Sequence, residues 1–136
     1  MGKVGHKEIV DLYKKGNVYL YPTEFAEIDC ISVSKAQASG CIPVTSDLGA
    51  LGEKKGVGGI FIHSSKDKDT WCQPFQFNFA IEDKEMLDAM VKMTVSILKS
   101  DKDEEERDEM ISHALYRYDW ETVANVWNNE LLKDLN

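Results

Sequence analysis

Three short apolar runs, each followed by a turn, constrain the fold of this 136-residue chain more than any other feature. They span residues 18–21, 42–45 and 59–62, and each is continuous rather than alternating. Continuous runs of this length are typical of strands that are buried on both faces of a parallel sheet. A helical pattern over residues 31–39 separates the first two runs, and a turn-rich stretch over 46–58 separates the next two. The pattern predicts an α/β fold with three neighbouring parallel strands in chain order.

Helices are predicted on both sides of this segment. Residues 6–15 form a helical pattern that ends at Gly16. Residues 82–136 contain three further helical patterns, and Asp101 and Asp119 are expected to cap the second and third. We expect the apolar stripes of these three helices to be core. The stripes are Met86, Leu87, Met90, Thr94, Ile97 and Leu98; then Met110, Ile111, Ala114, Leu115 and Tyr118; then Trp120, Val123, Trp127 and Leu131.

The chain is expected to be a single partial domain over residues 1–136. Its βαβ segment covers 6–81, and its helical segment covers 82–136. An independent doubly wound domain has five or six strands, whereas only about three are visible here, so the expected fold is a partial Rossmann-like sheet. The strand at 18–21 would then present an unpaired apolar edge, which predicts either a missing N-terminal half or self-association. Residues 63–79 are expected to form a long surface connection.

Charge and composition exclude several classes of function. The net charge is −8, and all of it comes from residues 82–136, so the acidic half would repel the phosphates of a nucleic acid. No apolar run approaches the ~20 residues that a membrane span needs, and no secretory signal is visible, which predicts a cytoplasmic protein. The three cysteines, Cys30, Cys41 and Cys72, lack the spacing of a metal site and are expected to be reduced thiols.

Two loops are expected to meet at the carboxyl ends of the strands, where open α/β sheets bind ligands. The first, residues 22–32, carries carboxylates and leads into a helix N-terminus, whose amides suit a phosphate. The second covers residues 46–53. Carboxylates accept hydrogen bonds from sugar hydroxyls, so a crevice with both kinds of group suits a nucleotide sugar. Asp29 is expected to cap the helix, and His63 is expected to be a surface residue.

The segment from Tyr21 to Glu53 resembles the donor-binding segment of group-1 glycosyltransferases with the GT-B fold. The family shows a strand, Pro-Ser/Thr, a Glu, a second Glu-Ala, Pro-Val and a glycine loop ending in Glu. Here the matching residues are Pro22-Thr23, Glu27, Ala36, Pro43-Val44 and Gly49 to Glu53. Residues 118–124 also resemble the closing helix of that family. The resemblance thus implies half of a GT-B fold and a retaining transfer from a nucleotide diphosphate sugar, without metal or other cofactor.

The resemblance also implies roles for individual residues. Glu27 would be the catalytic carboxylate that contacts the donor sugar, and the amides of Cys30, Ile31 and Ser32 would face the phosphates. Glu53 takes the carboxylate position of the glycine loop, shifted by one residue. Lys35 stands where the family has its second Glu, and it is expected either to contact the donor or to form a salt bridge. The residues expected to bind the donor are therefore Cys30, Ile31, Ser32, Lys35 and Glu53.

The chain departs from the family in ways that leave alternatives open. Lys35 cannot accept hydrogen bonds from a ribose, and Cys30 replaces a glycine near the phosphates. The strands that carry the family's basic diphosphate-binding residues are not visible, so we expect weak or absent transfer by this chain alone. The alternative is a non-catalytic relic or interaction domain. A third possibility, another nucleotide-binding α/β protein, lacks support because no glycine-rich phosphate loop is present.

Overall fold

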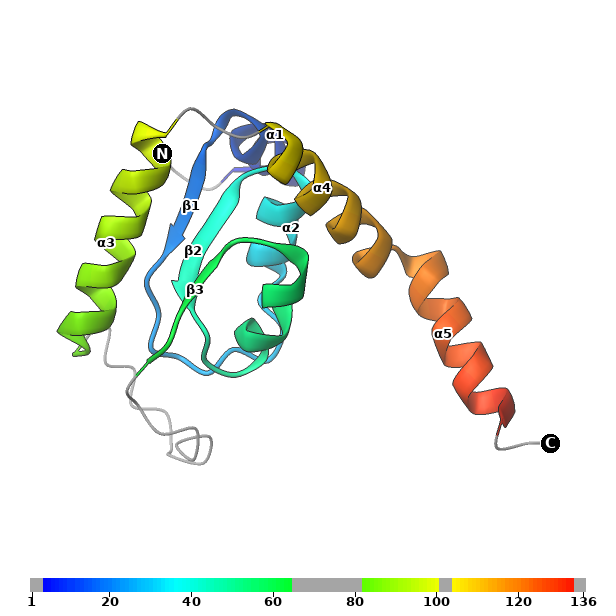
Figure 1. Ribbon diagram of the computed structural model, residues 1–136. Coiled ribbons are helices and arrows are strands. Elements are labelled where there is room, and N and C mark those ends of the chain that lie inside the picture. Colours follow the sequence, from blue (N-terminus) through cyan, green and yellow to red (C-terminus); the bar gives the residue numbers. More distant parts are fainter. Residues whose placement is uncertain (1–3, 65–81, 101–103, 134–136) are drawn as a thin grey trace.

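The computed structural model describes residues 4–64, 82–100 and 104–133. Within these ranges it contains a parallel sheet and a helical C-terminal part, as the sequence predicts (Figure 1). No helix in the described ranges is both long and apolar enough to span a membrane. The elements are α1 (His6–Lys15), β1 (Val18–Tyr21), α2 (Ile31–Ala38), β2 (Ile42–Ser46), the 3-10 helix η1 (Ala50–Val57), β3 (Ile60–Ile62), α3 (Lys84–Lys99), α4 (Glu104–Tyr118) and α5 (Trp120–Lys133).

The sheet has the predicted strand order, β1-β2-β3, with both pairs parallel. Val18 of β1 lies opposite Ile42, and Val44 of β2 lies opposite Ile60. The prediction is therefore confirmed, although β3 begins one residue later than expected and β2 ends one residue later. The turn-rich stretch between β2 and β3 contains η1, which the sequence pattern did not predict.

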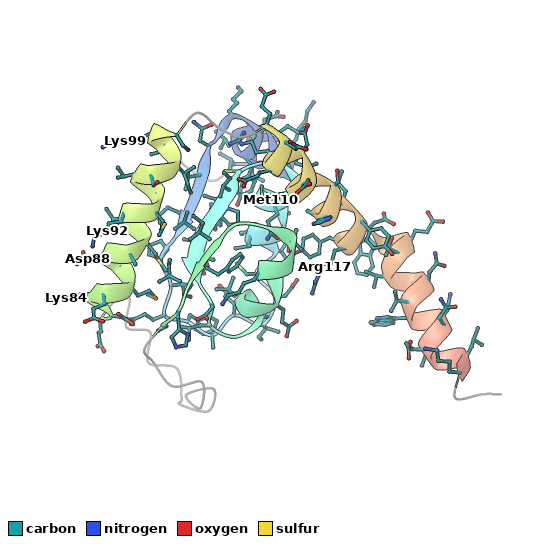
Figure 2. All side chains as sticks on the ribbon, viewed as in Figure 1. Lys84, Asp88, Lys92, Lys99, Met110 and Arg117 are labelled. Atoms are coloured by element: carbon teal, nitrogen blue, oxygen red, sulfur yellow. The ribbon has the colours of Figure 1, made fainter. Side chains whose placement is uncertain are left out.

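Helices cover both faces of the sheet. On one face α3 packs through Met86 and Met90 against Val44, while Lys84, Asp88, Lys92 and Lys99 point away from the sheet (Figure 2). On the other face α1 and α2 pack through Tyr13 and Ala36, with Cys41 completing the cluster. The carboxylate of Glu24, just after β1, accepts hydrogen bonds from the amides of Glu82 and Asp83 at 2.9 and 2.6 Å. This contact fixes the start of α3 beside the carboxyl end of β1.

The two last helices differ in how they meet the body of the molecule. Helix α4 packs on α2 and η1 and buries Met110 and Ala114, as predicted, whereas Leu115 of the same predicted stripe is 58% exposed. Helix α5 begins at the expected cap, since Asp119 Oδ2 accepts from the Thr122 amide at 3.0 Å, but it extends away from the sheet (Figure 1). No residue of α5 is buried, and Trp120 is 83% exposed. The expectation that the α5 stripe belongs to the core is wrong, because helical spacing identifies an apolar face but not what covers it.

The edge of the sheet at β1 is open within the described residues, where β1 pairs only with β2. Leu20 on this strand is 41% exposed. The expectation of an unpaired apolar edge therefore agrees with the described part of the chain. The predicted surface connection over residues 63–79 lies almost wholly outside the described residues, as do Cys72 and the predicted cap at Asp101.

Candidate functional site

The loops that follow β1 and β2 meet at the carboxyl edge of the sheet. Glu27 and Gly49 form an isolated parallel bridge, and the amide of Ala50 donates to the carbonyl oxygen of Glu27 at 2.8 Å. Gly49 has a φ of +57°, and a Cβ built on it would lie 2.5 Å from the Glu27 carbonyl oxygen. Only glycine fits this conformation and this close approach. The glycine of the second loop therefore fixes the backbone of Glu27 in the first.

The carboxylate of Glu27 is held by a tyrosine that the sequence analysis did not single out. The phenol of Tyr21, the last residue of β1, donates to Oε1 of Glu27 at 2.5 Å. Burial, and then the hydrogen bond and negative charge of Glu27, raise the pKa of Tyr21 to about 12. The phenol thus keeps its proton at neutral pH and donates it to Glu27. This hydrogen bond joins residues six positions apart across an irregular turn. Neither helical nor strand periodicity would indicate such a contact.

The first turn of α2 begins a few residues after Glu27 in the chain. Its N-cap is Cys30, which makes no side-chain capping hydrogen bond and has left-handed backbone angles, with φ 54° and ψ 69°. Glycine adopts this conformation without strain, so the cysteine stands at a position where the backbone favours glycine. Ile31 is 61% exposed at the start of the helix. The amides of Ile31 and Ser32 belong to the first turn of α2, which has no carbonyl partners within the helix.

Burial raises the pKa of the Cys30 thiol above its ordinary value, and the nearby charges of Glu27 and Asp29 add to the rise. The Val33 amide and the Lys54 cation act in the opposite direction without reversing it. The thiol is therefore protonated at neutral pH, which argues against a role for Cys30 as a nucleophile. Burial likewise raises the pKa of Tyr19, against a hydrogen bond with Ser32 that lowers it.

A polar cluster behind this turn was missed by sequence reasoning. Lys54 of η1 is only 4% exposed, and its Nζ donates to Asp29 Oδ1 at 2.8 Å and to Ser34 Oγ at 2.7 Å. The ammonium also lies 4.9 Å from the centre of the Tyr118 ring. Asp29 therefore binds a lysine rather than capping α2, so the capping prediction is wrong: the N-cap is the next residue, Cys30. Nothing in the spacing of Lys54 indicated that it would be buried.

The buried side chain of Gln37 completes this cluster. Its Nε2 donates to the carbonyl oxygens of Lys54 at 3.0 Å and of Gly58 at 2.7 Å. Its Oε1 accepts from the phenol of Tyr118 at 2.9 Å. The amide of one fully buried glutamine therefore links α2 to the middle and the C-terminal end of η1 and to the end of α4. These contacts tie the C-terminal end of α2 to η1 and α4.

Two further predicted site residues, Lys35 and Glu53, take separate positions. The Nζ of Lys35 lies 3.3 Å from Nδ1 of His6 in α1, on an exposed part of the surface. The contact directs this lysine toward α1. Glu53 is exposed within η1, three residues after the Ala50 amide that bonds to Glu27. Glu53 therefore follows the loop that meets Glu27, whereas Lys35 contacts a different part of the molecule.

The carboxyl ends of β2 and β3 carry a second polar group. Asp47 Oδ2 lies 3.0 Å from Lys55 Nζ and 3.2 Å from His63 Nδ1, and Asp47 Oδ1 accepts from the Ser64 amide at 3.3 Å. Burial raises the pKa of Asp47, but the hydrogen bonds from these three groups outweigh it and the net pKa is lowered. The His63 side chain is 76% exposed, in agreement with its predicted surface position. Asp47 therefore contacts both described residues that follow β3, His63 and Ser64.

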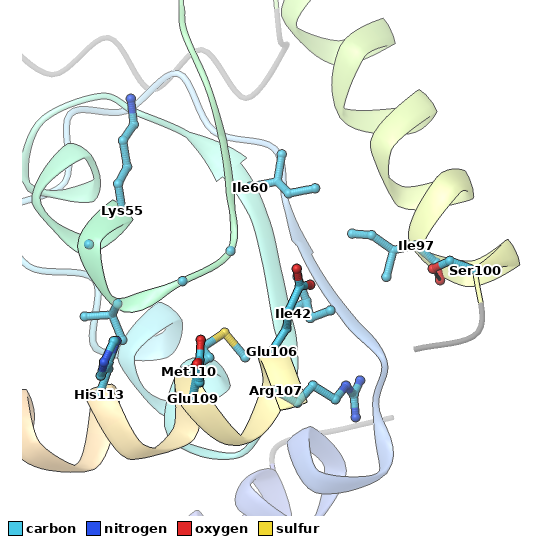
Figure 3. A pocket seen from close by; sticks show the side chains of 14 residues that line it. Ile42, Lys55, Ile60, Ile97, Ser100, Glu106, Arg107, Glu109, Met110 and His113 are labelled. Carbon is cyan, nitrogen blue, oxygen red and sulfur yellow. Dashed lines mark hydrogen bonds between the residues drawn. The ribbon is translucent and has the colours of Figure 1, made fainter. Parts of the chain in front are cut away.

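Two cavities in the described structure lie away from this edge. One, of about 460 Å³, lies at the amino ends of β2 and β3 and is lined by Ile42, Ile60 and Ile97 and by Met110 and His113 of α4 (Figure 3). The other, of about 530 Å³, lies between η1, α4 and α5 beside Trp127. Among the described residues no group of three or more metal-ligating side chains is close enough together to hold a metal ion. Glu27 and residues 30–32 line neither cavity, and the candidate site is the open carboxyl edge that carries them.

Comparison of the chain with protein-family models and with curated proteins gives no match.

Proposed function

We propose that this chain is the donor-binding part of a GT-B glycosyltransferase, which transfers a sugar from a nucleotide diphosphate sugar to an acceptor hydroxyl with retention of configuration. The observation that carries the proposal is the pairing of Glu27 with Gly49 at the carboxyl ends of β1 and β2. This pairing sets a carboxylate beside the N-terminus of α2, which is the combination that a sugar diphosphate requires.

Each part of the donor would meet a suitable group. Glu27 accepts hydrogen bonds from sugar hydroxyls, and the amides of Cys30, Ile31 and Ser32 donate to the diphosphate. In the transfer, the bond between the anomeric carbon and the diphosphate oxygen breaks, and a bond to the acceptor oxygen forms. The acceptor proton leaves with the diphosphate or to solvent. Amides that stabilise the developing diphosphate charge lower the barrier without a bound metal.

Lys35 and Glu53 have different places in this proposal. Glu53 lies in η1, directly after the glycine loop, and supplies a second carboxylate for the donor. Lys35 does not enter the proposed donor contacts, since its ammonium faces His6. The basic groups that neutralise the diphosphate would come from a partner polypeptide, which would also cover the open edge of β1. We therefore expect donor binding by this chain but little transfer.

The test is equilibrium binding of UDP-glucose, ADP-glucose and GDP-mannose, measured by isothermal titration calorimetry. The proposal predicts saturable binding of at least one of these donors, weakened at least about tenfold by Glu27→Gln because a charged hydrogen-bond acceptor is lost. Glu85→Gln, on the exposed first turn of α3, is the matched control and should bind as the wild type does. Absence of binding by all three donors would overturn the proposal.

A second candidate is a non-catalytic interaction domain, and the observation that favours it is the exposed stripe of α5. Trp120, Trp127 and Leu131 on this helix are 83%, 67% and 63% exposed. Exposed aromatic residues on one face are typical of protein-binding surfaces. The same calorimetric experiment separates the two candidates, because an interaction domain has no need to bind any nucleotide sugar.

A further inference from the structure

Glu27 is held by hydrogen bonds both at its backbone and at the tip of its side chain. At the backbone, the carbonyl oxygen of Glu27 accepts from the Ala50 amide at 2.8 Å, and Gly49 packs directly against it. At the tip of the side chain, Oε1 accepts from the Tyr21 phenol at 2.5 Å. Among the described hydrogen bonds of the Glu27 side chain, only Oε1 is used, so Oε2 is available to a ligand. A glutamate fixed in this way has lost its rotational freedom before any ligand arrives.

Tyr21 is itself firmly placed. It is the last residue of β1, in register with Thr45 of the central strand. The hydroxyl of Thr45 donates to the carbonyl oxygen of Tyr21 at 2.8 Å. The Tyr21 ring stacks on Tyr19, with centroids 5.8 Å apart and planes 14° apart, and Tyr19 in turn contacts Tyr13 edge to face. The phenol that reaches Glu27 therefore projects from a fixed ring on a fixed strand.

We propose that Tyr21 is a positioning residue, which holds one oxygen of Glu27 so that the other accepts hydrogen bonds from the hydroxyls of a bound sugar. This inference rests on the proposed function, because it assigns Glu27 a sugar ligand. Its physical basis is preorganisation. Because the carboxylate is ordered before the ligand binds, the binding free energy does not include the entropic cost of ordering that side chain. The phenol also supplies a neutral donor, so it orients the carboxylate and leaves its negative charge in place.

The first arm of the test asks whether the hydrogen bond exists, and it needs no ligand. The ionisation of individual tyrosines is followed by NMR of protein labelled with ¹³C at the tyrosine ring carbon that bears the hydroxyl. Because Glu27 contributes to the raised pKa of Tyr21, Glu27→Gln should lower that pKa and leave the raised pKa of Tyr118 unchanged. Tyr118, the last residue of α4, serves as the internal control because its raised pKa has no contribution from Glu27. An unchanged Tyr21 titration in Glu27→Gln would overturn the inference.

The second arm asks whether the hydrogen bond serves a ligand. The dissociation constants of UDP-glucose, ADP-glucose and GDP-mannose are measured for the wild type, Tyr21→Phe, Glu27→Ala and the double variant. We expect Tyr21→Phe to weaken binding about 3- to 10-fold, which corresponds to the ordering of one side chain. In the Glu27→Ala background Tyr21→Phe should have no further effect. Tyr13→Phe is the control: Tyr13 contacts the ring of Tyr19, which stacks on Tyr21, and its hydroxyl does not bond to Glu27. This variant should bind the donor as the wild type does.

The outcomes separate the inference from the proposed function. If the wild type binds a donor and Tyr21→Phe binds it equally well, the positioning role is wrong while the proposed function stands. If Tyr21→Phe weakens binding equally with and without Glu27, the tyrosine acts through something else, and the inference is overturned. If the wild type binds none of the three donors, the proposed function fails and the positioning role fails with it, even where the first arm confirms the hydrogen bond. Urea unfolding of each variant verifies that Tyr21→Phe folds.

Discussion

Gly49 lies so close to the backbone of Glu27 that a Cβ on the glycine would meet the Glu27 carbonyl oxygen at 2.5 Å. This approach joins the loop after β1 to the loop after β2, and the bridge between the two residues extends the parallel pairing beyond the ends of the strands. The position of the Glu27 carboxylate at the carboxyl edge depends on it.

Gly49→Ala should therefore destabilise the protein and displace Glu27. The φ of +57° and the contact at 2.5 Å both oppose a side chain at this position, and strain of this kind costs about 1–3 kcal/mol. Gly56→Ala is the matched control, because a Cβ there meets nothing within 4 Å. The measurement is the free energy of unfolding in urea. Equal stability of the two variants would show that the two loops are not held together by this contact.

Cys30→Gly should be at least as stable as the wild type. The left-handed angles of Cys30 cost an L-residue about 1–2 kcal/mol, which glycine avoids, although glycine loses more entropy on folding. Cys30→Val should be less stable by at least about 1 kcal/mol, because a β-branched side chain tolerates this conformation least. Urea unfolding of the three proteins gives the order. A wild type measurably more stable than Cys30→Gly would contradict it.

Gln37→Met should destabilise the protein by about 2–4 kcal/mol, because it leaves the Lys54 and Gly58 carbonyls and the Tyr118 phenol without their partner. Tyr118→Phe removes only one of these hydrogen bonds and should cost about 1 kcal/mol. The two losses should not add in the double variant, since the residues share a hydrogen bond. Thermal or urea unfolding checks this, and full additivity would contradict the described network.

Asp47 should make stability depend on pH in the acid range. Since its folded pKa is lowered, Asp47 contributes stability above its ordinary pKa of about 4, and this contribution is lost as the pH falls through the folded value. The stability difference between the wild type and Asp47→Asn should therefore be largest near neutral pH and shrink below about pH 4. Asp88→Asn, on the outer side of α3, is the control (Figure 2). A difference that is constant with pH would contradict the lowered pKa.

The parallel sheet could be predicted from the sequence because strands with helices packed on both faces leave continuous apolar runs, although only β2 is largely buried and β1 and β3 are partly exposed. The strand order could be predicted because one helix joins β1 to β2 and one loop joins β2 to β3. Connections of this kind favour neighbouring parallel strands. Helical periodicity placed Met86 and Met90 in the core, and both are buried, whereas Leu98 of the same stripe is 56% exposed. The resemblance to the glycosyltransferase family marked Cys30 as standing where that family has a glycine, and the left-handed angles of Cys30 give that observation a physical basis.

The parts that could not be predicted depend on contacts between distant residues. Lys54 is buried because Asp29, Ser34 and Tyr118 surround its ammonium, and these residues come from two distant parts of the chain, the start of α2 and the end of α4. The Trp127 stripe looked like core because periodicity reports a face without its partner. Tyr21 was interpreted as strand core, whereas its phenol is the partner of Glu27.

The central claim is that the carboxyl edge between the two loops is the ligand site. It is tested most directly by NMR of the backbone amides during addition of the donor that binds in the calorimetric panel. The account predicts the largest shifts at Glu27, at residues 30–32 and at residues 49–53, with little change at His113 or Trp127. Shifts concentrated around His113 and Trp127, which line the cavities beside α4, or no shifts with any of the three donors, would contradict it.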